Sequence, residues 1–138
     1  MQKLSRRQML ATTCAAGIAA AEPGELMAGN KEPALQPLVH MVYFWLKRPE
    51  STEDREALIA GLQTLRQIPV IQTLYIGVPA STEKRDVVDN SFQVSELMFF
   101  PDVEAQKRYQ DHPVHQAFVK NCEHLWQRVV VYDSMAVE

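Results

Sequence analysis

Nine consecutive residues, Leu38–Leu46, constrain the fold more strongly than any other part of the sequence. They read Leu-Val-His-Met-Val-Tyr-Phe-Trp-Leu, a composition rich in the aromatic and β-branched residues that favour strands. Side chains alternate between the two faces of a strand, and here both faces are apolar apart from His40. One sheet with helices on a single side would leave Met41, Tyr43 and Trp45 in water. The sequence therefore predicts a second cover for this strand, most economically another copy of the same sheet.

A proline marks a break between two helices in the C-terminal half of the chain. Pro113 lacks an amide hydrogen and has a fixed φ, so it suits the first position of a helix. The residue before a proline is pushed out of the helical region, so His112 ends the preceding helix, which Asp102 is expected to cap. We therefore expect Tyr109 in the last turn of one helix and His115 in the first turn of the next.

Hydrophobic periodicity predicts the other elements. Ser51 or Thr52 is expected to cap a helix with a stripe of leucines. Residues 79–90 are expected to form a polar link that is either mobile or a lid. The order β-α-β-β-α-α-β predicts an α+β, ferredoxin-like fold with a four-stranded antiparallel sheet. Further strands are predicted at residues 70–78, 92–100 and 128–137. The third strand places on one face Phe92, Val94, Glu96, Met98 and Phe100.

The first 37 residues are typical of an export signal followed by a linker. A basic start that contains Arg6 and Arg7 precedes an uncharged run, residues 9–21, that is too short to span a bilayer. Ser-Arg-Arg-Gln-Met-Leu resembles a twin-arginine signal, and Ala19-Ala20-Ala21 provides a cleavage site. We therefore expect a signal peptide over 1–21, a flexible linker over 22–37 and one domain over 38–138, in a periplasmic or otherwise exported protein. An amphipathic helix that stays attached is the alternative.

Charge limits the class of partner. Cleavage after residue 21 leaves 14 minus 3, or 11, basic residues against 17 acidic ones, a formal charge of −6. Nucleic acids and anionic membranes require basic patches, so neither is expected as a partner of the mature chain. Cys122 becomes the one remaining cysteine, which excludes a disulfide within the chain.

The segment Tyr109–Phe118 reads Y-x-x-H-P-x-H-x-x-F and resembles the stress-responsive A/B barrel (Dabb) family of dimeric α+β barrels. The likeness runs from about Leu38 to Val137, with His40 and Lys47 bounding the first strand. It implies a homodimer whose two sheets face each other to close a barrel. That arrangement agrees with the two-sided burial expected for the first strand.

One plant branch of the family consists of polyketide cyclases, and it implies roles for three residues. A tyrosine and a histidine at the places of Tyr109 and His115 carry the proton chemistry there, and a first-strand histidine at the place of His40 lines the pocket. This chain differs at Val94, where the cyclase has another pocket histidine. That departure leaves the substrate and the activity open.

Tyr109 and His115 are the candidate catalytic residues because their side chains suit proton transfer. Imidazole titrates near pH ~6.5, and the positive end of a helix disfavours imidazolium, so His115 suits a general base. Tyr109 could donate its hydroxyl hydrogen to a carbonyl oxygen as charge builds there. The pair fits proton removal next to a carbonyl or aldol closure. The alternative is structural: His115 ties the helix start to a strand, and Tyr109 fills the core.

His40 and His112 are candidate ligand-binding residues, although His112 is also expected to cap the second helix. A metal site at His40, His112 and His115 would need a convergent geometry and a carboxylate or other fourth ligand, which the spacing does not provide, so no metal site is predicted. Cys122 lies on an apolar stripe and is expected to be buried and unreactive. No haem or flavin motif occurs, and no cofactor is expected.

Three function classes follow from these observations. The chain is either an exported homodimer that binds a small molecule near Tyr109 and His115, a cyclase-like lyase that uses both residues, or a structural stress-response protein forming higher oligomers. A cavity that reaches Tyr109, His115 and His40 would favour the first two classes. Side chains filling that space would favour the third.

Overall fold

The computed structural model describes residues 37–137 of the chain. The predicted signal peptide and nearly all of the predicted linker lie outside the described residues. No helix within the described part is long and apolar enough to cross a membrane.

The element order is β-α-β-β-α-α-β, as the sequence predicts. The long elements are β1 (Leu38–Leu46), α1 (Thr52–Thr64), β2 (Thr73–Gly77), β3 (Val94–Phe100), α2 (Val103–Asp111), α3 (Pro113–Cys122) and β4 (Trp126–Met135). Short 3₁₀ turns, Leu65–Gln67 and Glu123–Leu125, extend α1 and α3.

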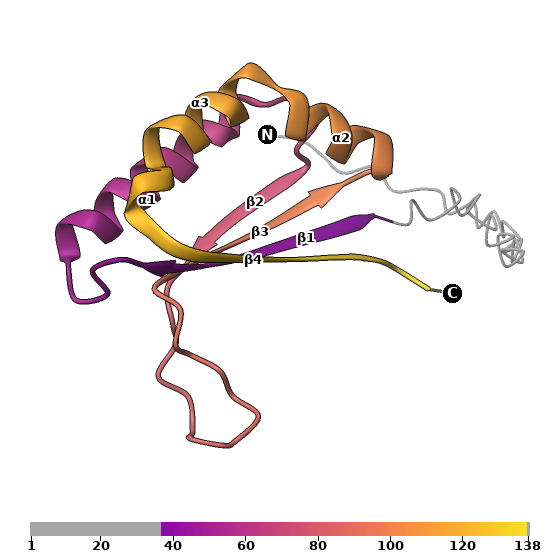
Figure 1. Ribbon diagram of the computed structural model, residues 1–138. Helices are drawn as coiled ribbons and strands as arrows, with labels where there is room; N and C mark the ends of the chain where they lie inside the picture. The colour runs from indigo at the N-terminus through magenta and orange to yellow at the C-terminus, as the bar shows by residue number, and fades with distance from the viewer. Residues whose placement is uncertain (1–36, 138) are drawn as a thin grey trace, which may run out of the picture. The chain divides into compact units, whose positions relative to one another are not determined.

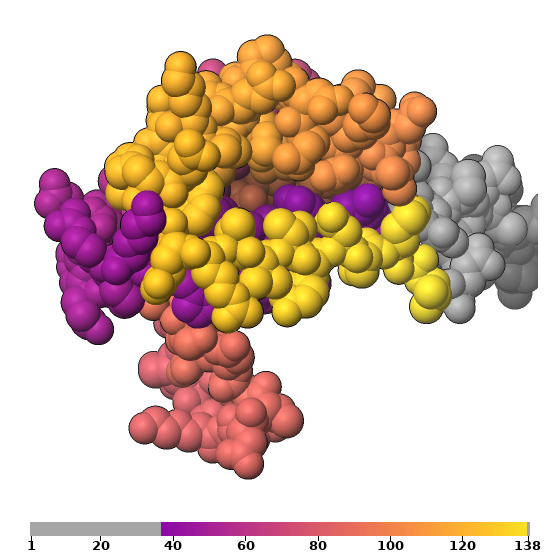
Figure 2. Space-filling model, viewed as in Figure 1, coloured from indigo at the N-terminus to yellow at the C-terminus, as the bar shows by residue number. Residues whose placement is uncertain are grey.

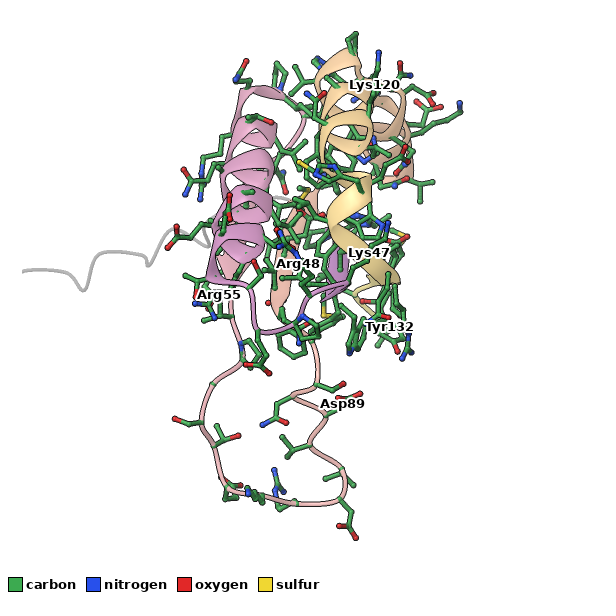
Figure 3. All side chains as sticks on the ribbon, turned by 60° about the vertical axis from the view of Figure 1, so that its left-hand side comes forward. Lys47, Arg48, Arg55, Asp89, Lys120 and Tyr132 are labelled. Atoms are coloured by element: carbon green, nitrogen blue, oxygen red, sulfur yellow. The ribbon has the colours of Figure 1, made fainter. Side chains whose placement is uncertain are left out.

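The four strands form one antiparallel sheet in the order β2-β3-β1-β4. The three helices cover one face of this sheet, and the long loop between β2 and β3 extends away from the opposite side (Figure 1). Asp89 lies on that loop, well apart from the helices (Figure 3). One face of the sheet is therefore free of helices.

The central strand β1 shows the predicted alternation. Every second residue from Leu38 to Leu46 is buried beneath the helices, His40 included, and the residues between them are half-buried. Tyr43 packs edge-on against Phe92 and Tyr132 on the helix-free face. Within one chain, this second apolar face is only partly covered.

The strand β2 is shorter than the predicted range of residues 70–78. The amide of Ile71 donates to the Ile68 carbonyl, so Pro69 and Val70 form a turn. The amide of Gln72 donates to the carbonyl of Phe99 in β3, and the residue-by-residue pairing of β2 with β3 begins at Thr73, opposite Phe99. The turn therefore delays the start of β2 to Thr73. The strand β3 begins at Val94, two residues later than predicted. The strand β4 spans Trp126–Met135, so it begins and ends two residues earlier than predicted.

The helix break forms as predicted. The carboxylate of Asp102 caps α2 by accepting from the Ala105 amide at 2.7 Å. His112 adopts extended backbone angles (φ −68°, ψ 137°) between α2 and α3, and its Nδ1 accepts from the Val114 amide at 3.1 Å. The chain therefore changes direction between Tyr109 and His115 while both helices keep their ends satisfied.

Gly61 lies where α1 packs against α3. A Cβ at this position would lie 2.5 Å from Cys122 Sγ and 3.2 Å from the Phe118 ring. Cys122 itself is buried, and burial raises the pKa of its thiol. The lack of a side chain at Gly61 thus permits a close approach of the two helices, and Cys122 is a packing residue.

Candidate functional site

A cavity of about 210 Å³ lies between the helices and the sheet. Figure 2 shows a hollow between the helices, in orange, and β4, in yellow, where atoms of β1 are visible. The polar residues that line the cavity are His40, Glu96, Tyr109, Gln110 and His115. The apolar lining consists of Val42, Phe44, Phe118, Val119, Trp126, Val129 and Val131.

Tyr109 and His115 meet in this cavity across the helix break. Their ring centroids are 4.6 Å apart, with Tyr109 contributed by α2 and His115 by α3. Tyr109 is 1% exposed and His115 is 9% exposed. The break at Pro113 thus brings the two predicted catalytic side chains into contact.

The imidazole of His115 is positioned to be a neutral base. Its Nδ1 lies 3.1 Å from the carbonyl oxygen of Gln110, which can only accept, so Nδ1 carries the hydrogen and Nε2 keeps its lone pair. Burial lowers the pKa of His115, the Gln110 carbonyl partly offsets this, and His40 lowers it further. His115 is therefore uncharged at neutral pH.

The hydroxyl of Tyr109 remains protonated over the physiological range. Burial raises the pKa of Tyr109, and the negative charges of Glu96 and Asp133 raise it further. A phenol in this state is a hydrogen-bond donor, so it can stabilise an oxygen on which negative charge develops.

His40 is held by a residue that the sequence analysis did not single out. Its Nδ1 lies within hydrogen-bond distance of the Asp133 carboxylate in β4, and because a carboxylate can only accept, Nδ1 carries a hydrogen. The His40 ring also packs edge-on against Tyr109 at a centroid distance of 5.7 Å. Three predicted residues, His40, Tyr109 and His115, therefore form one chain of aromatic contacts.

Glu96 is the cavity residue that sequence reasoning placed on the correct face but did not identify as a site residue. It is 3% exposed, and its Oε2 has no hydrogen-bond partner among the described residues. Burial raises the pKa of Glu96 to about 8. A glutamate among Val94, Met98 and Phe100 on the inward face of β3 was the signal, because an acidic side chain at a core position requires an explanation.

His112 does not line the cavity; its ring nitrogen caps α3 instead. His124 is exposed. In residues 37–137, no group of three or more His, Cys, Asp or Glu side chains is placed to hold a metal ion.

An antiparallel β2-β3-β1-β4 sheet with helices on one face defines a ferredoxin-like α+β protein, here with a polar-lined cavity beneath the helices. Residues 38–136 match the Stress responsive A/B Barrel Domain (Dabb) family, and the chain belongs to this family. None of the curated proteins compared with this chain matches it by sequence.

Solved structures share the fold at low sequence identity. The hydroxynitrile lyase from Passiflora edulis has a TM-score of 0.63 and 20% identity, over 75% of this chain and 95% of its own. A Dabb family protein with a ferredoxin-like fold from Mesorhizobium loti has a TM-score of 0.61 and 22% identity, over 75% and 99%. A dimeric ferredoxin-like protein of unknown function from Thermobifida fusca has a TM-score of 0.59 and 17% identity, over 73% and 92%. These similarities confirm the predicted fold.

Proposed function

We propose that the protein is an exported homodimer that binds a small organic molecule in the cavity between its helices and its sheet. The main support for this proposal is the lining of the cavity, in which apolar and aromatic side chains surround a few convergent polar groups. That combination is typical of ligand sites. The polar end of the ligand lies at Tyr109 and His115, and its apolar body lies against Phe44, Phe118 and Trp126.

The size of the cavity favours a ligand with about one ring. Drug-sized molecules occupy pockets of roughly 300–1,000 Å³, and an engineered apolar cavity of about 150 Å³ binds benzene. A cavity of about 210 Å³ lies between these limits. It suits a small aromatic or branched aliphatic compound better than a long polyketide chain.

The open space also argues against a purely structural role. A chain that served only as a building block of a larger assembly would gain from filling this space with side chains, because unfilled volume costs stability. The polar groups around the cavity would add to that cost.

Lyase chemistry is the second candidate, favoured by the contact between Tyr109 and His115. In that reaction, Nε2 of His115 removes a proton from a hydroxyl group or from a carbon next to a carbonyl. Tyr109 donates a hydrogen bond to the oxygen on which charge develops. The similarity of fold to a hydroxynitrile lyase supports this candidate at the level of fold alone.

Ligand-detected NMR with a panel of one-ring compounds tests the first candidate. His115→Ala should abolish the binding of every hit while lowering stability by no more than about 1 kcal/mol, the usual scale for one hydrogen bond. The matched control is His124→Ala, since His124 is an exposed histidine near the other end of α3. A large drop in melting temperature for His115→Ala, with binding retained, would support the structural role instead.

Tyr109→Phe separates the two candidates. The substitution removes one hydroxyl oxygen and keeps the ring that packs against His115 and Phe100. If the site is catalytic, turnover of a hit compound should fall by roughly 10²-fold or more while binding changes little. No detectable turnover by the unmodified protein would leave the binding role alone.

A further inference from the structure

Glu96 is a buried carboxyl group that neither candidate function uses. It projects from β3 onto the helix-covered face, where its backbone pairs with Val42 in β1 and with Ile76 in β2. Within residues 37–137 it has no ion pair, and its Oε2 has no hydrogen-bond partner. A buried polar atom without a partner costs about 1–3 kcal/mol, so its presence beside a cavity points to a ligand.

In the described part of the chain, the groups around Glu96 include no lysine or arginine to pair with it. His40 on β1, Tyr109 on α2 and His115 on α3 line the same cavity, and Asp133 on β4 holds the far side of His40. No lysine or arginine is part of the lining. Lys120 of α3 is exposed (Figure 3). An ionised Glu96 would therefore face no lysine or arginine, and both imidazoles of the lining already have partners: His40 contacts Asp133 and His115 contacts the Gln110 carbonyl.

We propose that Glu96 selects the ligand: it acts as a neutral carboxylic acid that donates a hydrogen bond to an uncharged oxygen, so the site accepts alcohols and carbonyl compounds and excludes carboxylates. This inference rests on the proposed function, because it requires a small molecule in the cavity. Glu96 would give the ligand a third polar contact, beside those with Tyr109 and His115. A hydroxyl oxygen can accept from Glu96 while its hydrogen is donated to Nε2 of His115.

An organic ammonium ion is the competing ligand class, because a carboxylate among aromatic rings also suits a cation. To bind such a ligand, Glu96 would have to be ionised, and the ammonium ion would have to leave water. The penalty for burying both charges can exceed their mutual attraction. A neutral hydrogen bond avoids that penalty, and this comparison favours the alcohol or carbonyl class.

The raised pKa of Glu96 makes the proposal measurable. With a pKa of about 8, roughly nine-tenths of the carboxyl groups are neutral at pH 7 and about one-tenth at pH 9. The affinity for a ligand that requires the neutral form should therefore fall about tenfold between these values. His115, whose pKa is lowered, and Tyr109, whose pKa is raised, keep their protonation states over this range.

Three probes of nearly equal size test the selection: benzyl alcohol, benzoate and benzylamine, titrated into the full chain by NMR or calorimetry at pH 7 and pH 9. We expect benzyl alcohol to bind best at pH 7, to lose about tenfold in affinity at pH 9, and to outcompete benzoate at both. Glu96→Gln keeps a hydrogen-bond donor and cannot ionise, so its affinity for benzyl alcohol should not change with pH. Glu96→Met removes the donor at similar size and should weaken binding at pH 7 several-fold.

The outcomes separate this inference from the function on which it rests. Tighter binding of benzylamine than of benzyl alcohol would overturn the selection by a neutral acid and leave a small-molecule site in place. The same holds if benzyl alcohol binds equally at both pH values, or if Glu96→Gln keeps the pH dependence of the unmodified chain. Failure of all three probes to bind the unmodified chain would refute both proposals. The comparison of pH 7 with pH 9 needs no substitution, so it stands even if a variant fails to fold.

Discussion

Nδ1 of His40 lies 2.5 Å from Oδ1 of Asp133, a contact that joins β1 to β4 across 93 positions of the sequence. The carboxylate accepts, so Nδ1 carries a hydrogen and is the donor of this contact. The side chain of Asp133 is 46% exposed, whereas that of His40 is 5% exposed. A partly solvated residue on an edge strand thus fixes the tautomer of a buried one beside the cavity.

Loss of the Asp133 acceptor should release the His40 tautomer. In Asp133→Leu, ¹⁵N chemical shifts of the His40 ring should change to those of a mixture of tautomers, and binding in the cavity should weaken several-fold. Asp133→Asn keeps an acceptor oxygen and should preserve the tautomer. Stability should change little in Asp133→Asn and fall by about 1–3 kcal/mol in Asp133→Leu, which leaves the buried Nδ1 of His40 without an acceptor. An unchanged His40 spectrum in Asp133→Leu would show that another group sets the tautomer.

Glu96 should make the stability of the protein fall as pH rises. Its pKa is raised from 4.5 to about 8 in the folded state, so between these values the folded chain holds a proton that the unfolded chain has released. Stability should decline across this window by up to several kcal/mol and level off above it. Glu96→Gln should remove this decline, as measured by urea denaturation at pH 5, 6.5 and 8. The exposed Glu56→Gln is the control and should behave like the unmodified chain.

The helix-free face of the sheet should form a dimer interface, since its apolar side chains are only partly covered within one chain. Two structural relatives are described as dimeric. Light scattering should give twice the monomer mass at micromolar concentration. Trp45→Glu places a charge among Tyr43 and the half-buried residues of that face and should give monomer or aggregate. Val103→Glu adds the same charge at an exposed position of α2 and should remain dimeric. A monomeric unmodified chain would contradict the two-sheet barrel.

Gly61→Ala should destabilise the protein, although alanine is normally favoured over glycine within a helix by about 1 kcal/mol. The new Cβ would lie 2.5 Å from Cys122 Sγ, so the helices α1 and α3 would have to move apart. In a Cys122→Ala background, the same substitution should cost less or become stabilising. A double-mutant cycle measures this coupling, and strictly additive effects would exclude the close contact.

Export should depend on the arginine pair at the N-terminus. Replacement of both Arg6 and Arg7 by lysine keeps the charge but removes the feature typical of twin-arginine signals, so precursor should accumulate in the cytoplasm. Cell fractionation with mass measurement of the processed chain is the readout. The control is Lys3→Arg, which should be exported and cleaved normally. Normal processing after the double replacement would exclude this export route.

Local sequence patterns were sufficient to predict the order of the elements. The two-residue alternation from Leu38 to Leu46 determined both faces of β1, and the backbone restriction imposed by Pro113 located the break between α2 and α3. Both signals act over a few residues. The start of β2 at Thr73 was not predicted, because it depends on the turn at Pro69 and Val70 and on the pairing with β3, which forms only in the folded sheet.

The candidate site was predictable only in part for the same reason. Tyr109 and His115 are six positions apart, so their meeting follows from local geometry. The pairing of His40 with Asp133 depends on the register between the first and last strands, which the whole sheet sets. Glu96 was placed on the inward face by alternation, but its lack of a partner depends on which side chains α2 and α3 bring to it.

The polar residues around the cavity come from β1, β3, α2 and α3, with Asp133 of β4 behind His40. No single element or short fragment of the chain therefore contains the site, and a partly folded form that has released any one of these elements has lost it. Ligand binding in the cavity should therefore stabilise the whole folded domain. A bound ligand should slow hydrogen exchange of the slowest-exchanging amides of the central strand β1 as much as that of the amides that line the cavity. Hydrogen exchange with and without ligand would show whether the domain opens as one unit or releases α2 and α3 first.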